Sequence, residues 1–146
     1  MEPSGLSNRA GGSPDAQRRE RRERRERRSR VLIAEDDDSL RTLLRISIDV
    51  GDVRIDEAAD GLAALELARR HPPDVALLDW MLPGASGLDV CRGLRAEPET
   101  AGALIVIVTA RTLDEDRDKA LAAGADHFIR KPFSPVALLE TVRHAL

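Results

Sequence analysis

Cysteine is nearly absent from this sequence of 146 residues, which contains Cys91 and no other. A single cysteine excludes an internal disulfide framework and a metal cluster built from several cysteines, and it is typical of proteins in a reducing compartment. We therefore expect a cytoplasmic location. Aromatic residues are also scarce: there is no tyrosine, and the others are Trp80, Phe128 and Phe133. A domain that stacks nucleic-acid bases on aromatic side chains is therefore not expected.

Long apolar runs are missing as well. No run approaches the roughly 20 residues that a helix needs to cross a membrane, so we expect no membrane span. The N-terminal arginines are not followed by an apolar stretch. We therefore expect no secretory signal peptide here.

The net charge of −3 conceals two segments of opposite charge. Residues 1–30 contain ten arginines and five acidic residues, which gives a net charge of +5. Residues 31–146 contain 13 basic and 21 acidic residues, which gives a net charge of −8. A basic segment is therefore joined to an acidic body, and the two are best considered separately.

The basic segment has the composition of an unfolded arm. Residues 1–17 are rich in glycine, serine and proline, and residues 18–28 repeat Arg-Arg-Glu without an apolar face. We predict a disordered basic arm over residues 1–29, with at most a transient helix, and a single domain over residues 30–146. One hypothesis is that the arginines of residues 18–30 bind nucleic acid or another anionic surface, and the alternative is a solvated linker.

Apolar runs alternate with amphipathic stretches in the body of the chain. Three of the five runs are continuous, as expected for strands that are buried on both faces of a sheet. Apolar residues at three- and four-residue intervals between the runs predict helices, with Asp60 and Ser134 as N-caps. Five βα units in succession predict an α/β fold, a five-stranded parallel sheet with helices on both faces. The five runs are residues 31–34, 53–55, 75–78, 104–108 and 127–129.

Polar residues follow four of these strands directly. In a parallel sheet the carboxyl ends of the strands share one edge, where sites are usually found. Each feature alone is common on protein surfaces, but their ordered occurrence predicts one crevice with several carboxylates, a hydroxyl and an ammonium. Such carboxylates need a compensating charge, and an all-oxygen site suits Mg²⁺. The residues are Glu35 to Asp38, Asp79, Thr109 with Ala110, and Lys131 with Pro132.

With these motifs the body resembles the receiver domain of response regulators in two-component signalling, which has a flavodoxin-like, CheY-like (βα)5 fold. The resemblance covers residues 30–146. Within the family, the sequence motifs are most similar to those of OmpR/PhoB-type receivers. The spacing from Asp79 to Pro83 and Gly87 is its most specific part. The matching stretches are Val31 to Asp37, Leu78 to Gly87, Ile107 to Arg111 and Gly124 to Phe133.

The resemblance implies a role for each site residue. Asp79 is expected to be the phosphoacceptor, which takes a phosphoryl group from a sensor histidine kinase or a phosphotransfer protein. Lys131 is expected to pair with a phosphoryl oxygen, and Thr109 to donate its hydroxyl to another. The expected Mg²⁺ ligands are the carboxylates of Glu35, Asp36 and Asp79 and the backbone carbonyl of Met81.

The resemblance also implies a switch. Movement of Thr109 toward the phosphate is expected to let Phe128 rotate inward, while Ala110 leaves room for the phosphate. The Lys131–Pro132 bond is expected to be cis and to aim the lysine into the crevice. The switched face of residues 113–146 would then bind a partner. OmpR/PhoB-type receivers use part of this face for phosphorylation-dependent dimers, although His127, Ala137 and Thr141 replace charged residues usual there.

An alternative class is a phosphohydrolase with an aspartyl nucleophile. Such enzymes place a second Asp two residues after the nucleophile, where this sequence has Met81. We therefore expect no turnover of external substrates, and no enzymatic activity beyond the domain's own phosphorylation and dephosphorylation.

Overall fold

Five short parallel strands form one sheet in the order β2-β1-β3-β4-β5. The computed structural model describes residues 12–26 and 28–146. The strands are β1 (Arg30–Ala34), β2 (Arg54–Ala58), β3 (Val75–Asp79), β4 (Leu104–Thr109) and β5 (His127–Arg130). The helices of the body are α3 (Asp38–Ile48), α4 (Gly61–Arg70), α5 (Gly87–Ala96), α6 (Asp114–Ala122) and α7 (Pro135–Val142), followed by the short 3₁₀ helix η1 (Arg143–Ala145). This arrangement confirms the predicted (βα)5 fold.

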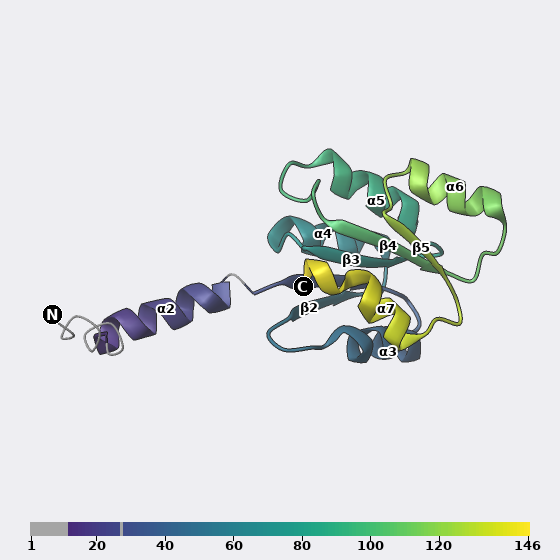
Figure 1. The fold of residues 1–146 in the computed structure, drawn as a ribbon. Coiled ribbons are helices and arrows are strands. Elements are labelled where there is room, and N and C mark those ends of the chain that lie inside the picture. Colours follow the sequence, from purple (N-terminus) through teal and green to yellow (C-terminus); the bar gives the residue numbers. More distant parts are fainter. Residues whose placement is uncertain (1–11, 27) are drawn as a thin grey trace, which may run out of the picture.

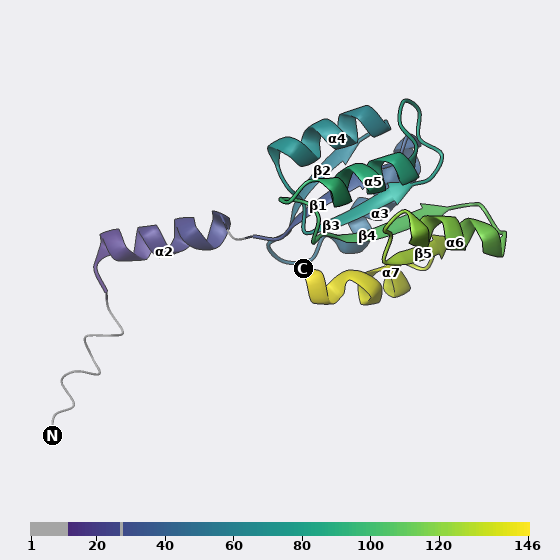
Figure 2. The ribbon, with the colours of Figure 1, turned by 90° about the horizontal axis from the view of Figure 1, so that it is seen from above.

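Helices cover both faces of the sheet, as Figures 1 and 2 show. Successive side chains of a strand point to opposite faces, so each buried strand contributes to two apolar layers. Leu32, Leu78 and Ile107 pack on the side of α4, α5 and α6. The neighbouring residues Val31 and Leu77 pack on the side of α3 and α7. Burial on both faces explains why the central strands are apolar without interruption.

The helices begin at capping residues that the sequence supplies. The carboxylate of Asp60 accepts a hydrogen bond from the amide of Ala63 at 2.7 Å. The hydroxyl of Ser134 accepts one from the amide of Ala137 at 3.2 Å. Both predicted N-caps are therefore confirmed, and each contributes on the order of 1 kcal/mol.

The described part of the N-terminal segment contains one helix. Residues Pro14–Glu26 form a helix, α2, which Figure 1 shows apart from the sheet. The repeat of Arg and Glu places opposite charges at helical spacing, and Arg19 Nε lies 4.0 Å from Glu23 Oε1. Residues 1–11 and 27 lie outside the described part, so the division into an arm over 1–29 and a domain over 30–146 stays a prediction.

Among residues 12–26 and 28–146, no helix combines the length and the apolar character that crossing a membrane requires.

Candidate functional site

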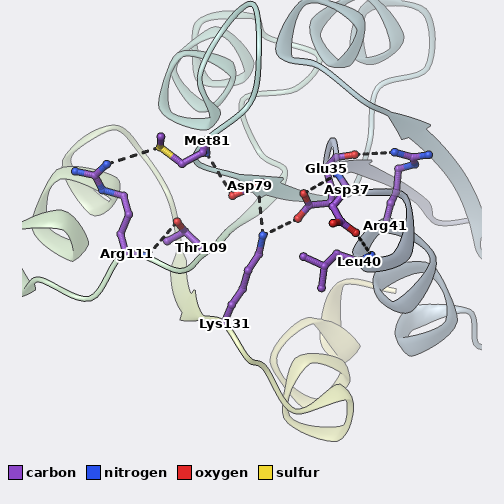
Figure 3. Close-up of polar contacts among 9 residues, drawn as sticks. All are labelled: Glu35, Asp37, Leu40, Arg41, Asp79, Met81, Thr109, Arg111 and Lys131. Atoms are coloured by element: carbon purple, nitrogen blue, oxygen red, sulfur yellow. Dashed lines mark hydrogen bonds and ion pairs between the residues drawn. The ribbon is translucent and has the colours of Figure 1, made fainter.

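The predicted polar residues meet at the carboxyl edge of the sheet. Glu35 follows β1, Asp79 ends β3, Thr109 ends β4 and Lys131 follows β5. Because these four strands are neighbours, residues that are far apart in the sequence face one another (Figure 3). One carboxylate oxygen from each of Glu35, Asp36 and Asp79 lies within 4.8 Å of the other two.

Lys131 lies between two carboxylates. Its Nζ is 2.8 Å from Glu35 Oε1 and 3.3 Å from Asp79 Oδ2. Burial by itself lowers the pKa of Lys131, but the hydrogen bond to Glu35 and the negative charges of Asp79 and Glu35 outweigh that effect. The pKa of Lys131 therefore lies above its ordinary value, and the side chain is a fixed cation at neutral pH.

Glu35 is the most buried acid of the site, with 1% of its surface exposed. This burial raises the pKa of Glu35 above its ordinary value. The hydrogen bonds from Lys131 and from the amide of Asp37, at 3.1 Å, oppose the shift without cancelling it, and the charge of Asp79 adds to it. A second cation near Glu35 would stabilise its charged form.

The carboxylate of Asp79 is held by two contacts and also borders a hollow at the surface. The amide of Met81 donates to its Oδ1 at 3.3 Å, and Lys131 lies against its other oxygen. A hollow beside it is lined by Asp79, Met81, Thr109, Ala110, Arg111 and Lys131. Ala110 therefore adjoins the hollow, and a small group attached to Asp79 would have space there.

Two glycines shape the turn that follows Asp79. Gly84 has a φ of +81°, a conformation that residues with a side chain rarely adopt. A Cβ atom at Gly87 would lie 2.3 Å from the backbone oxygen of Asp79, so the first turn of α5 packs directly against the site. The glycines of the Asp79 motif are therefore required by close packing and by backbone conformation.

The segments after β4 and β5 complete the site. The Thr109 hydroxyl accepts a hydrogen bond from the amide of Arg111 at 3.3 Å. The amide of Lys131 donates to the carbonyl oxygen of Thr109 at 2.8 Å, which joins the two segments. The peptide bond between Lys131 and Pro132 is cis, as the resemblance implied.

Phe128 lies on the same side of the sheet as α4, α5 and α6, where it packs against the buried core. Its ring meets that of Trp80 edge to face, with the ring centroids 6.4 Å apart. Trp80 is also covered by the guanidinium of Arg111, whose carbon lies 4.5 Å from the ring centroid. The role of Phe128 in a switch stays a prediction.

The donor set fits a hard divalent cation. Glu35, Asp36 and Asp79 offer oxygen atoms, which Mg²⁺ prefers, and the side chain of Asp36 is exposed to solvent. Lys131 alone does not balance three carboxylates. This charge excess and the all-oxygen chemistry agree with the predicted Mg²⁺ site, whereas the carbonyl of Met81 as a ligand stays a prediction.

Sequence reasoning missed one residue next to the acidic turn, which is formed by residues 35–38 where β1 leads into α3. Arg41 donates from Nη1 to the carbonyl oxygen of Glu35 at 2.8 Å, as Figure 3 shows. Its position could have indicated this contact. Arg41 lies three residues after Asp38, in the first turn of α3, where an arginine side chain can reach back to the preceding loop.

Comparison with known proteins identifies one matching domain family and several relatives. Residues 31–143 match the response regulator receiver domain family. The chain is 38% identical over 117 residues to the phosphate regulon transcriptional regulatory protein PhoB of Rhizobium meliloti, covering 80% of this chain and 52% of the relative. It is 43% identical over 117 residues to the DNA-binding response regulator MtrA of Mycolicibacterium paratuberculosis, covering 80% and 51%. The chain thus spans about half the length of these curated relatives.

Solved structures with similar folds include the chemotaxis protein CheY4 of Vibrio cholerae. It has a TM-score of 0.74 and 28% identity, covering 82% of this chain and 99% of that one. The response regulator domain of Thermotoga maritima CheB has a TM-score of 0.69 and 30% identity, covering 82% and 96%.

Proposed function

This chain belongs to the family of response regulator receiver domains of two-component systems, and we propose that it accepts a phosphoryl group on Asp79. The donor would be a sensor histidine kinase or a phosphotransfer protein. The observation that carries the proposal is the surroundings of Asp79. Its carboxylate adjoins an open hollow and lies 3.3 Å from a lysine ammonium, and that hollow is also lined by Thr109 and Ala110.

The chemistry follows from these positions. A carboxylate oxygen of Asp79 attacks the phosphorus atom, the bond from phosphorus to the donor's nitrogen breaks, and the imidazole leaves with the electron pair. The product is an acyl phosphate on Asp79. Lys131 would then pair with a phosphoryl oxygen, and the Thr109 hydroxyl would donate to another after leaving the amide of Arg111.

We further propose that Glu35, Asp36 and Asp79, together with the carbonyl of Met81, hold Mg²⁺. When bound, the ion would offset the negative charge on the phosphoryl oxygens. Glu35 supports this assignment because its buried carboxylate shares Lys131 with Asp79. A phosphoryl group that draws Lys131 toward Asp79 would leave Glu35 in need of another cation.

The proposed output is a change in the face formed by residues 113–146. Thr109 ends β4, and Phe128 of the neighbouring strand β5 lies beside Ile107 of β4. Thr109 and Phe128 therefore belong to the two strands that lead into α6 and α7. A shift of Thr109 toward the phosphate would be passed to this face, which would bind a downstream protein or a second copy. PhoB is named as a transcriptional regulatory protein and MtrA as a DNA-binding response regulator, and we propose a similar regulatory role for this chain.

The test is phosphorylation by a small donor. The purified chain is incubated with acetyl phosphate and Mg²⁺, and its intact mass is measured. We expect one added phosphoryl group in the wild type and in Asp49→Asn, which alters an exposed carboxylate at the end of α3. We expect none in Asp79→Asn or after chelation of Mg²⁺. Absence of phosphorylation in a folded wild type, or full phosphorylation of Asp79→Asn, would refute the proposal.

A further inference from the structure

The guanidinium of Arg41 uses three different nitrogens for three different partners. Nη1 donates to the carbonyl oxygen of Glu35 at 2.8 Å, and Nη2 to Asp38 Oδ1 at 2.6 Å. Nε forms an ion pair with Glu57 Oε1 at 3.3 Å. With 19% of its side chain exposed, Arg41 is held between α3, the acidic turn and β2.

Two hydrogen bonds hold the backbone of Glu35, one at its amide and one at its carbonyl. Glu35 comes directly after β1, and its amide still donates to the carbonyl oxygen of Ala58 at the end of β2, at 3.0 Å. Its carbonyl group belongs to the peptide that leads to Asp36. Arg41 supplies a donor for this carbonyl, and Glu57 in turn anchors Arg41 to β2. The carbonyl of the peptide between two of the proposed Mg²⁺ ligands, Glu35 and Asp36, therefore accepts a hydrogen bond from an anchored side chain, and Figure 3 shows this bond from Arg41.

We propose that Arg41 is a positioning residue for the metal and phosphoryl site. It fixes the peptide between Glu35 and Asp36, so that the two carboxylates face Asp79 before any ligand arrives. This inference rests on the proposed function, because it assigns Arg41 a part in holding Mg²⁺ at that site. Groups behind the direct ligands commonly change metal affinity by roughly ten- to a hundredfold when they are removed.

Positioning and simple electrostatics predict opposite results. Arg41 is a positive charge close to a cation site, so its charge alone would weaken Mg²⁺ binding, and Arg41→Gln would strengthen it. If Arg41 acts by positioning, both Arg41→Gln and Arg41→Lys weaken binding. A lysine keeps the charge, but its single nitrogen cannot replace three nitrogens at fixed positions in one plane.

Arg45 provides a matched control. It lies one turn further along α3, and its Nε forms an ion pair with the other oxygen of the same glutamate, Glu57 Oε2, at 3.3 Å. Among the described residues, no hydrogen bond or ion pair joins Arg45 to residues 35–38. Arg45→Gln therefore removes the same charge from the same helix, and also a partner of Glu57, without touching the carbonyl of Glu35.

The experiment is a Mg²⁺ titration without phosphodonor. Trp80 is the single tryptophan and follows Asp79 directly, so its fluorescence reports binding. We expect Arg41→Lys and Arg41→Gln to raise the Mg²⁺ dissociation constant by roughly tenfold or more, and Arg45→Gln to leave it unchanged. A second measurement is the ¹⁵N chemical shift of the Asp36 amide in the metal-free protein. It should move in both Arg41 variants, because Arg41 bonds the carbonyl of that peptide.

Urea unfolding without Mg²⁺ identifies variants that are merely unstable. If Arg41→Lys does not fold, Glu57→Gln replaces it, with Arg45→Gln as its control, and we expect a smaller rise in the dissociation constant. Unchanged or tighter binding in folded Arg41 variants overturns the inference and leaves the proposed function intact, since wild-type phosphorylation is measured separately. A wild type that binds no Mg²⁺ and is not phosphorylated overturns both.

Discussion

The ammonium of Lys131 is hydrogen-bonded to Glu35, at 2.8 Å, across 96 positions of sequence. It also lies 3.3 Å from Asp79, so one cation is shared by the buried acid and the proposed phosphoacceptor. Two carboxylates would repel each other at this edge without it. The stability of the domain should therefore depend on Lys131, and should do so in a way that changes with pH.

We expect Lys131→Met to lower the free energy of unfolding at neutral pH by about 1–3 kcal/mol in metal-free buffer. The loss should be smaller near pH 4, roughly the ordinary range of carboxyl groups. Without the bond from Lys131 the pKa of Glu35 rises further, so the folded variant holds a proton that the unfolded chain releases, and its stability falls as pH rises.

The alkaline limit follows from Lys131 itself. Its pKa is raised in the folded state, so the stability that it contributes is complete below its unfolded pKa and is lost as pH rises through the folded value. Urea unfolding at several pH values measures both limits. A difference between wild type and Lys131→Met that does not change with pH would contradict the shared-cation arrangement.

Arg111 and Asp116 form an ion pair at 3.1 Å that ties the segment after β4 to α6. Asp116 is only 3% exposed, so Arg111→Ala leaves a buried carboxylate without its cation. We expect Arg111→Ala to lower the free energy of unfolding by about 1–2 kcal/mol. The effect is limited because the side chain of Arg111 is partly exposed to water, which weakens the ion pair. Trp80 fluorescence should change too, because Arg111 covers its ring.

A double-mutant cycle separates this pair from other effects of Arg111. Adding Asp116→Asn to Arg111→Ala should recover part of the lost stability, whereas adding Asp118→Asn, an exposed residue of the same helix, should not. Full additivity of Arg111→Ala and Asp116→Asn would show that the ion pair contributes nothing.

A side chain at Gly87 should destabilise the domain and disturb the site. A Cβ atom there would lie 2.3 Å from the backbone oxygen of Asp79, so Gly87→Ala must displace either α5 or the end of β3. We expect unfolding free energy to fall by about 1–3 kcal/mol and phosphorylation by acetyl phosphate to slow. Gly102→Ala is the control, because no atom lies within 4 Å of its added Cβ. Equal behaviour of the two variants would argue against this packing.

Removal of residues 1–26 should leave phosphorylation unchanged. The deletion ends before Ser29, whose carbonyl oxygen accepts a hydrogen bond from the amide of Arg54 at 2.8 Å, so β1 and β2 keep their pairing. Slower phosphorylation of a folded truncated chain would show that residues 1–26 take part in the reaction.

The same deletion tests the hypothesis that the arm binds nucleic acid. α2 exposes Arg18, Arg19 and Arg22. If the hypothesis holds, the full chain binds duplex DNA with an affinity that falls steeply with salt, and the truncated chain does not bind. Equal binding by both chains, or by neither, would reject it.

The order of polar residues behind apolar runs was sufficient to predict the sheet and its edge. Continuous runs such as residues 75–78 identify strands that are buried on both faces, and Asp79 follows that run directly. The caps Asp60 and Ser134 were also predictable, because the interaction of an N-cap with its helix is local. The same local reasoning favoured a disordered arm with at most a transient helix, because the repeat of Arg and Glu has no apolar face, whereas Pro14–Glu26 form the helix α2.

What the sequence by itself determined, then, is which elements form and which side chains reach the carboxyl edge, because periodicity and strand-end position are local properties. The tertiary structure decided the partners. Lys131 pairs with Glu35 as well as Asp79, Phe128 rests against Trp80, and Arg41 reaches Glu57 on β2. These contacts depend on strand order, register and side-chain conformation, which arise only when distant segments pack together.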